Sequence, residues 1–161
     1  MSSAFHITFW LVIIALTFFS VMYVVFSYEK LGEISDLSQR IALLDARDFL
    51  QWSAILLGIA VVLLVLVLGF MIAYGFNDVY EIPPAVFLLY IGFLVWFLIT
   101  LALLIVTYEK LGSSQDILQL EDVQIARRDL FVSLAAVATV SALLTIGYYG
   151  YVYRMDNYYR C

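Results

Sequence analysis

Few residues of this chain are of the types that carry out chemistry inside proteins. His6 is the only histidine and Cys161 the only cysteine, so one chain cannot form an internal disulfide. A haem or metal site needs several ligands, and no sequence cluster of Cys, His or carboxylates supplies them. Nucleotide-binding loops, zinc spacings and hydrolase motifs are also absent. We therefore expect no catalytic residue, no metal and no cofactor, and we interpret His6 as a polar residue at a helix end.

The charged residues occur in two matching sets. The pentapeptide Tyr28-Glu29-Lys30-Leu31-Gly32 recurs in the second half of the chain as Tyr108-Glu109-Lys110-Leu111-Gly112, at an offset of 80. Arg47-Asp48 matches Arg128-Asp129 at an offset of 81, which predicts one inserted residue between the pentapeptide and the Arg-Asp pair of the second half. Each glycine follows a long apolar run, so we expect it to close a helix in the left-handed conformation.

Two roles are open for these charges, which lie where the apolar runs end. They could form a gate or a partner-docking ring at the mouth of a membrane protein, or they could simply stop the helices at the lipid head groups. In the second case their salt bridges are worth about 0–1 kcal/mol each. The eight residues are Glu29, Lys30, Arg47, Asp48, Glu109, Lys110, Arg128 and Asp129.

The composition identifies lipid as the solvent of this 161-residue chain. Hydrophobic residues make up 65% and charged residues 13%, against about 45–50% and about 25% in soluble domains. The mean hydropathy is +1.02. The net charge of −5 argues against nucleic acid as a partner, because such binding needs a basic surface.

Four stretches are long enough to cross a bilayer as helices, which takes about 20 residues each. They cover residues 5–27, 49–74, 84–107 and 130–153, and none has Asp, Glu, Lys or Arg in its interior. We predict an all-α integral membrane protein with four transmembrane helices, because lipid leaves open backbone groups without partners. The repeated motif divides the chain into two tandem, parallel helical hairpins, residues 1–81 and 82–161.

The polar segment inside each predicted hairpin has helical periodicity. In residues 34–46 apolar side chains recur at Ile34, Leu37, Ile41 and Leu44, and residues 114–127 show a weaker version. We expect each segment to form a short amphipathic helix on the membrane surface. The alternative is one continuous helix that projects from the membrane and runs into the second span. Ser35 and Ser113 or Ser114 are the expected N-caps.

The basic residues predict an orientation. Six lie in the two polar segments (Lys30, Arg40, Arg47, Lys110, Arg127 and Arg128), and two, Arg154 and Arg160, follow the last span. Since Lys and Arg are enriched in cytoplasmic loops, we expect segments 28–48 and 108–129 in the cytoplasm and both termini on the opposite face.

Small side chains predict where helices approach closely. The fourth span carries one small face with Ala135, Thr139 and Gly147 and another with Ala138 and Ala142, and Ala54 and Gly58 form a shorter version in the second span. Trp96 falls near the middle of the third span and needs an acceptor for its indole N–H. We expect Thr100 or Ser20 to provide it.

The C-terminal tail, residues 154–161, continues a tyrosine-rich stretch. Tyr and Arg are the residue types that anchor protein interfaces, and aromatic residues also anchor helices at the membrane surface. Both interpretations are open for this tail. The candidate interface residues are Tyr151, Tyr153, Arg154, Tyr158, Tyr159 and Arg160.

These observations favour a non-enzymatic structural or assembly subunit of a larger membrane-associated complex, with lipid and other proteins or further copies of itself as partners. A membrane-containing virion is one such complex. The alternative is an oligomeric channel or facilitator for a small solute or ion, since Ser, Thr and backbone groups can line a pore. An enzyme acting on lipid is a weaker option, because the sequence offers no pair of nucleophile and base.

Overall fold

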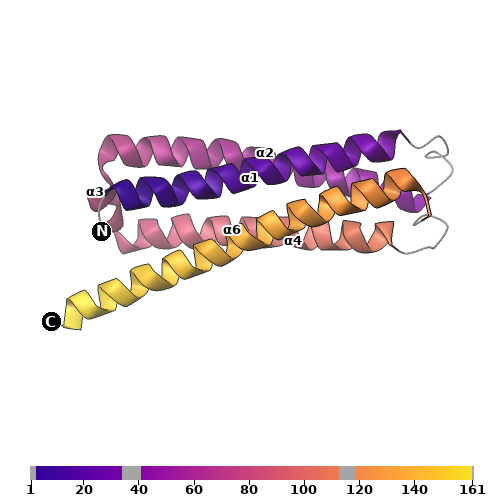
Figure 1. Cartoon of the computed structure of the whole chain (residues 1–161). Helices are drawn as coiled ribbons and strands as arrows, with labels where there is room; N and C mark the ends of the chain where they lie inside the picture. Colours follow the sequence, from indigo (N-terminus) through magenta and orange to yellow (C-terminus); the bar gives the residue numbers. More distant parts are fainter. Residues whose placement is uncertain (1–2, 34–40, 113–118, 161) are drawn as a thin grey trace.

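The computed structural model describes residues 3–33, 41–112 and 119–160, and for 155–160 the helical backbone alone. The described residues form the helices α1 (Ser3–Gly32), α2 (Ile41–Tyr74), α3 (Phe76–Tyr80), α4 (Pro83–Leu111) and α6 (Glu121–Arg160), with no strand among them. Figure 1 shows the long helices running antiparallel to their chain neighbours, and α6 continues past the end of the other three. All four long helices contain an apolar stretch long enough to cross a membrane.

The four long helices form a closed ring in cross-section. α1 packs against α2 and α6, and α4 packs against the same two helices. Gly75, at φ +100°, makes the turn between α2 and α3, a conformation that glycine adopts without steric cost. Pro83 starts α4, where its missing N–H is not needed.

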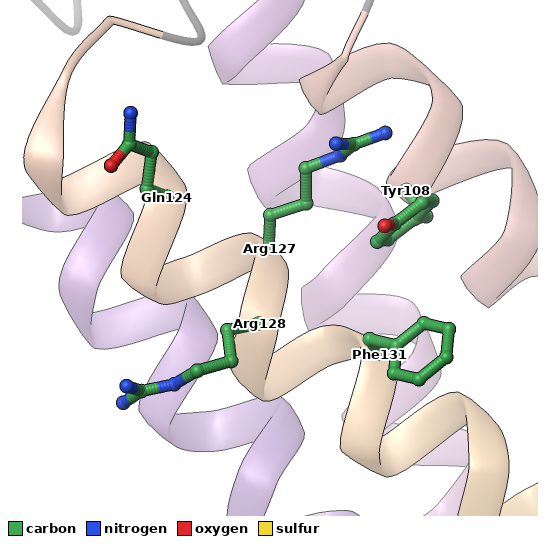
Figure 2. A pocket seen from close by; sticks show the side chains of 5 residues that line it. All are labelled: Tyr108, Gln124, Arg127, Arg128 and Phe131. Carbon is green, nitrogen blue, oxygen red and sulfur yellow. The ribbon is translucent and has the colours of Figure 1, made fainter.

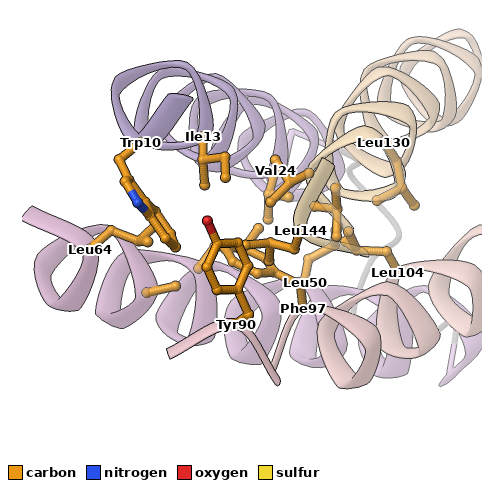
Figure 3. Close-up of a cluster of buried hydrophobic side chains, with 14 of the residues drawn as sticks. Trp10, Ile13, Val24, Leu50, Leu64, Tyr90, Phe97, Leu104, Leu130 and Leu144 are labelled. Carbon is orange, nitrogen blue, oxygen red and sulfur yellow. The ribbon is translucent and has the colours of Figure 1, made fainter. Parts of the chain in front are cut away.

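Each long helix buries one stripe of side chains at alternating spacings of three and four positions. In α1 the buried residues are His6, Trp10, Ile13, Thr17, Ser20, Val24, Ser27 and Leu31. In α2 the corresponding run is Leu43, Ala46, Leu50, Ser53, Leu57, Ala60 and Leu64. A repeat of about 3.5 residues keeps one seam facing the bundle axis, as in left-handed coiled coils. Figure 3 shows side chains from all four helices meeting in this interior.

The buried stripes of the second half repeat those of the first at the same constant offset as the pentapeptide. The buried positions of α4 are Val86, Tyr90, Phe97, Thr100, Leu104, Thr107 and Leu111, and those of α6 include Val123, Ala126, Leu130, Ser133, Val137, Val140 and Leu144. Subtracting that offset of 80 from each of these numbers gives a buried residue of α1 or α2. Asp129, Ala136 and Ser141 of α6 are buried as well, but the residues at that offset in α2 are only partly buried. The predicted insertion of one residue is therefore wrong for the described helices.

Hydroxyl groups join α1 to α6 in the middle of the bundle. The Ser20 and Ser133 Oγ atoms lie 2.6 Å apart, and Ser133 Oγ also donates to the Ser20 carbonyl at 3.0 Å. Nearer the charged end, Ser27 Oγ donates to the Ala126 carbonyl at 2.8 Å. Since lipid offers no competing partners, these bonds fix how the two helices lie against each other.

On the opposite side of the ring, Trp96 joins α4 to α2. Its indole N–H donates to the Leu56 carbonyl at 2.9 Å. The acceptors expected from the sequence, Thr100 and Ser20, are both wrong: Thr100 donates to the carbonyl of Trp96 itself at 3.0 Å, and Ser20 pairs with α6. A backbone carbonyl of a neighbouring helix carries no signature in the sequence.

The polar segments differ from the favoured prediction where the structure describes them. Residues 41–46 are the first turns of α2, and residues 121–127 are the first turns of α6, each continuous with its span. Residues 41–46 and 121–127 therefore follow the alternative prediction, in which the polar segment is continuous with its span. The physical reason is that Leu43, Ala46, Val123 and Ala126 are fully buried, so these turns pack within the bundle. Residues 34–40 and 113–118, with the predicted caps Ser35, Ser113 and Ser114, lie outside the described residues.

Candidate functional site at the charged end of the bundle

The ends of α1 and α4 and the starts of α2 and α6 meet at one end of the bundle (Figure 1). Three ion pairs occur there among the described residues: Lys30–Glu33 at 3.4 Å, Lys110–Asp45 at 3.9 Å and Arg128–Asp129 at 3.8 Å. Most of the side chains in them are at least one-third exposed, so each pair contributes little to stability. Glu29, Asp48 and Glu109 are exposed at the same end.

Arg47 occupies a defined position between the end of α1 and the start of α2. Its guanidinium carbon lies 4.1 Å from the centre of the Tyr28 ring. A Cβ atom on Gly32 would lie only 2.8 Å from Arg47 Nη2, so the glycine makes room for the cation. The position at the C-terminus of α1 is favourable for a positive charge, because the helix dipole is negative there.

Arg127 occupies the same position in the second half. Its guanidinium carbon lies 4.0 Å from the centre of the Tyr108 ring, and a Cβ atom on Gly112 would lie 2.7 Å from its Nη2. In both halves the arginine Nε is buried without a hydrogen-bond partner in the described part of the chain. The stacked arginine is thus the structural reason for the repeated Tyr and Gly of the pentapeptide.

Two predictions about these motifs are corrected by this geometry. Arg127, not Arg128, is the counterpart of Arg47, because it stacks on Tyr108 as Arg47 stacks on Tyr28. Gly112 has φ −100°, and Gly75 has the only positive φ among the described residues. Gly32 and Gly112 therefore do not close their helices in the left-handed conformation; they allow the close approach of a guanidinium.

A pocket of about 380 Å³ opens beside the second stacked arginine. It is lined by Tyr108, Gln124, Arg127, Arg128 and Phe131. In Figure 2 Arg127 extends across to Tyr108 of α4, while Arg128 extends to the other side of α6, away from Tyr108 and Phe131. Phe131 lies one turn below them, with its ring tilted against Tyr108 and 6.0 Å between the ring centres. The pocket combines positive charge with an apolar floor.

The corresponding positions of the first half carry different chemistry. At the same offset before Gln124, Arg128 and Phe131 stand Leu44, Asp48 and Gln51. The stacked arginine is common to both halves, but the second cation has an acid in its place in the first half. Only the second half therefore combines two arginines with an aromatic floor.

No protein-family model, no curated protein and no solved structure matches this chain.

At the opposite end of the bundle, polar and aromatic side chains join α3 to the long helices. The indole of Trp10 donates to Tyr80 Oη at 3.1 Å, and Tyr80 Oη lies 2.9 Å from Tyr90 Oη. Tyr151 donates to the Tyr80 carbonyl at 3.1 Å. His6 lies against the Tyr80 ring, with 4.2 Å between ring centres. Among the described residues no three His, Cys, Asp or Glu side chains gather to hold a metal ion.

The residues predicted to mediate helix packing divide into two groups. Gly147 lies where a Cβ would come within 2.8 Å of Phe9 and 2.9 Å of Tyr90, and Ala54 and Gly58 are half-buried. The other four are exposed on the outward face of α6, so within one chain they do not face another helix: Ala135, Ala138, Thr139 and Ala142.

The predicted interface residues of the C-terminal stretch all lie on α6. Tyr151 is half-buried, whereas Tyr153 and Arg154 are exposed. The side chains of Tyr158, Tyr159 and Arg160 lie outside the described part of the chain, although their backbone continues the helix.

Sequence reasoning misses most of the pocket. The repeated motifs mark Arg128 as a membrane-mouth charge, but they do not mark Tyr108, Gln124, Arg127 or Phe131 as site residues. One signal is present: the spacing from Tyr28 to Arg47 equals the spacing from Tyr108 to Arg127. That spacing, in place of the Arg-Asp dipeptide, identifies Arg127.

Proposed function

We propose that the chain is a duplicated two-helix unit, residues 1–81 and 82–161, that serves as a non-enzymatic assembly subunit of a larger membrane-associated complex. The observation that carries this proposal is the outward face of α6. There Ala135, Ala138, Thr139 and Ala142 are exposed on the side opposite the buried stripe of the same helix. Small residues at such spacing are the type that lets a second membrane helix approach closely.

The residues that flank this small face support the proposal. Phe131 is 55% exposed on one side of it and Ile146 is 67% exposed on the other. The small residues thus extend for about two turns between two large exposed side chains. A helix from a partner or from another copy would gain van der Waals contact by packing on this face.

The duplication rests on two kinds of agreement between the halves. The pentapeptide recurs at an offset of 80, and so do the buried stripes and the stacked arginines. Two copies of a helix pair that bury the same faces can pack together as a ring of four helices. With six basic residues against two, the end that carries the stacked arginines faces the cytoplasm in this proposal.

The interior of one bundle favours a structural role over a pore. Buried side chains such as Trp10, Phe97, Leu57 and Leu104 fill its axis, and no Asp, Glu, Lys or Arg occurs between residues 49 and 77. A channel would have to form between several copies, along the same face of α6.

Gentle extraction from the native membrane, followed by native electrophoresis and identification of bound proteins, tests the proposal. We expect a species larger than one chain that shifts to the monomer when Ala138 and Ala142 are both replaced by leucine. The matched control replaces Val62 and Val65, which are exposed on α2, by leucine and leaves the species unchanged. A wild-type monomer with no bound protein would contradict the assembly role.

A liposome flux assay distinguishes the channel alternative from the assembly role. Solute leak above that of empty vesicles, abolished by bulky substitution at Ala135 or Thr139, would replace the assembly proposal by a pore. Labelling Cys161 from each side of the membrane reports the orientation.

A further inference from the structure

The pocket beside Arg127 lies next to the start of a long uncharged stretch of α6. From Leu130 to Tyr153 the sequence has no Asp, Glu, Lys or Arg, a stretch of about 36 Å as a helix. Arg127, Arg128 and Asp129 precede that stretch. If the stretch crosses a bilayer, the polar half of the pocket lies at the head-group layer and Phe131 at the first part of the hydrocarbon.

The side chains of the pocket suit a phosphate group. A guanidinium presents several N–H donors that match phosphate oxygens. Stacking on Tyr108 and packing against Gly112 hold Arg127 in one place, which lowers the entropy cost of binding. Gln124 adds an amide at the rim.

Asp129 lies beside Arg128 with 3.8 Å between the two side chains; that of Asp129 is 11% exposed and that of Arg128 is 73% exposed. This separation is longer than that of a charge-assisted hydrogen bond, and solvent screens the exposed guanidinium. An anion in the pocket can therefore compete with Asp129 for Arg128.

From these features we propose that the pocket binds the phosphate of an anionic phospholipid, with Arg127 and Arg128 as its ligands and an acyl chain against Phe131. The apolar floor favours a lipid over a free phosphate ion, because Phe131 is 55% exposed and continues the pocket onto the outward surface of α6. This inference does not depend on the assembly role.

The first half of the chain provides an internal comparison. Arg47 stacks on Tyr28 as Arg127 does on Tyr108, but Asp48 replaces the second cation and Gln51 replaces the phenylalanine. The stacked arginine alone thus stabilises the end of the bundle in both halves. The lipid site is a property of the second half alone.

Native mass spectrometry of the full chain in detergent, titrated with phosphatidylglycerol or with phosphatidylcholine, tests the proposal. We expect one tightly bound phosphatidylglycerol per chain and weaker phosphatidylcholine binding. Each basic residue near an anionic surface contributes about fivefold in affinity. Arg127→Gln should therefore weaken phosphatidylglycerol binding about fivefold, and Arg128→Asp, which reverses a charge, about 25-fold.

Arg47→Gln is the matched control, because it removes the other stacked arginine at the same structural cost. It should leave lipid binding unchanged. The triple variant Leu44→Gln/Asp48→Arg/Gln51→Phe should give the first half a second lipid site, and this gain cannot arise from partial unfolding.

Three results would overturn the inference. Equal affinity for the two lipids would show that the net negative charge of the lipid is not recognised. Loss of lipid in Arg47→Gln as large as in Arg127→Gln would place the effect outside this pocket. Displacement of the lipid by inorganic phosphate at equal concentration would identify a site for the free ion instead.

Discussion

The guanidinium of Arg127 lies over the ring of Tyr108, with 4.0 Å from its central carbon to the ring centre. The contact joins the end of α4 to the start of α6, and Arg47 on Tyr28 joins α1 to α2 in the same way at 4.1 Å. Both arginines bury an Nε that has no hydrogen-bond partner in the described residues. The aromatic ring helps to hold each arginine in place, and the adjacent glycine leaves the space that this stack needs.

Gly112→Ala should weaken this stack. The new Cβ would lie 2.7 Å from Arg127 Nη2, which forces the guanidinium away from Tyr108. We expect a loss of about 0.5–2 kcal/mol, the range of a cation–π contact, measured by thermal unfolding in detergent. Gly92→Ala, where nothing lies within 4 Å, is the control and should not lower the midpoint. An unchanged midpoint for Gly112→Ala would show that the stack contributes nothing.

Gly147→Ala should separate α6 from its two neighbours. Its Cβ would lie 2.8 Å from Phe9 and 2.9 Å from Tyr90, both ring atoms in the packed interior. Overpacking of this kind costs about 1–3 kcal/mol. Gly150→Ala, nearly one turn away with open space around it, should be neutral or slightly stabilising, because alanine favours helix. Equal effects of the two substitutions would argue against close packing at Gly147.

Ser133→Ala should loosen α1 from α6. It removes the 2.6 Å contact with Ser20 Oγ and the 3.0 Å bond to the Ser20 carbonyl. We expect a loss of about 1 kcal/mol, as for other hydrogen bonds between membrane helices. The double variant Ser20→Ala/Ser133→Ala should lose less than the sum of the single losses, since both hydroxyls share one interaction.

Thr139→Ala is the control for the serine pair. Its hydroxyl is exposed and bonds to the Ala135 carbonyl of its own helix, so the unfolding midpoint should hardly change. Strict additivity of the two serine substitutions would disprove the shared contact.

Tyr80→Phe should destabilise the end of the bundle opposite the stacked arginines. Trp10 is 1% exposed and would lose the acceptor of its indole N–H, which costs about 1–3 kcal/mol for a buried donor. The fluorescence of Trp10 should change as well. Tyr149→Phe, at a site that is 73% exposed, is the control and should have no effect on either readout.

Tyr80 should also make the stability of the folded protein depend on pH in the alkaline range. Burial raises the pKa of the Tyr80 phenol above its ordinary value of 10. The protonated phenol is thus favoured by folding, so its contribution is complete below pH 10 and is lost as the pH rises through the raised pKa. Wild type should therefore lose stability more steeply above pH 10 than Tyr80→Phe. Parallel pH profiles for the two proteins would contradict this assignment.

The sequence determined the class of the molecule and the number of long helices. Four long runs without internal charges predict helices in lipid, where backbone groups need partners within the segment, and the helices α1, α2, α4 and α6 contain the predicted spans. The repeated Tyr and Gly were visible as well. The structural role of these residues was not visible, because a glycine that closes a helix and one that makes room for a guanidinium look the same in a sequence.

Which face of each helix points inward was decided only by the tertiary structure. In a soluble bundle polar residues mark the outer face, but in lipid both faces are apolar, so the sequence carries little signal for rotation about the helix axis. That is why Ala135, Ala138, Thr139 and Ala142 proved to face outward, why the acceptor of Trp96 is the Leu56 carbonyl, and why Arg127 rather than Arg128 stacks on Tyr108. Contacts between helices settle these positions, and such contacts exist only after the four helices have packed.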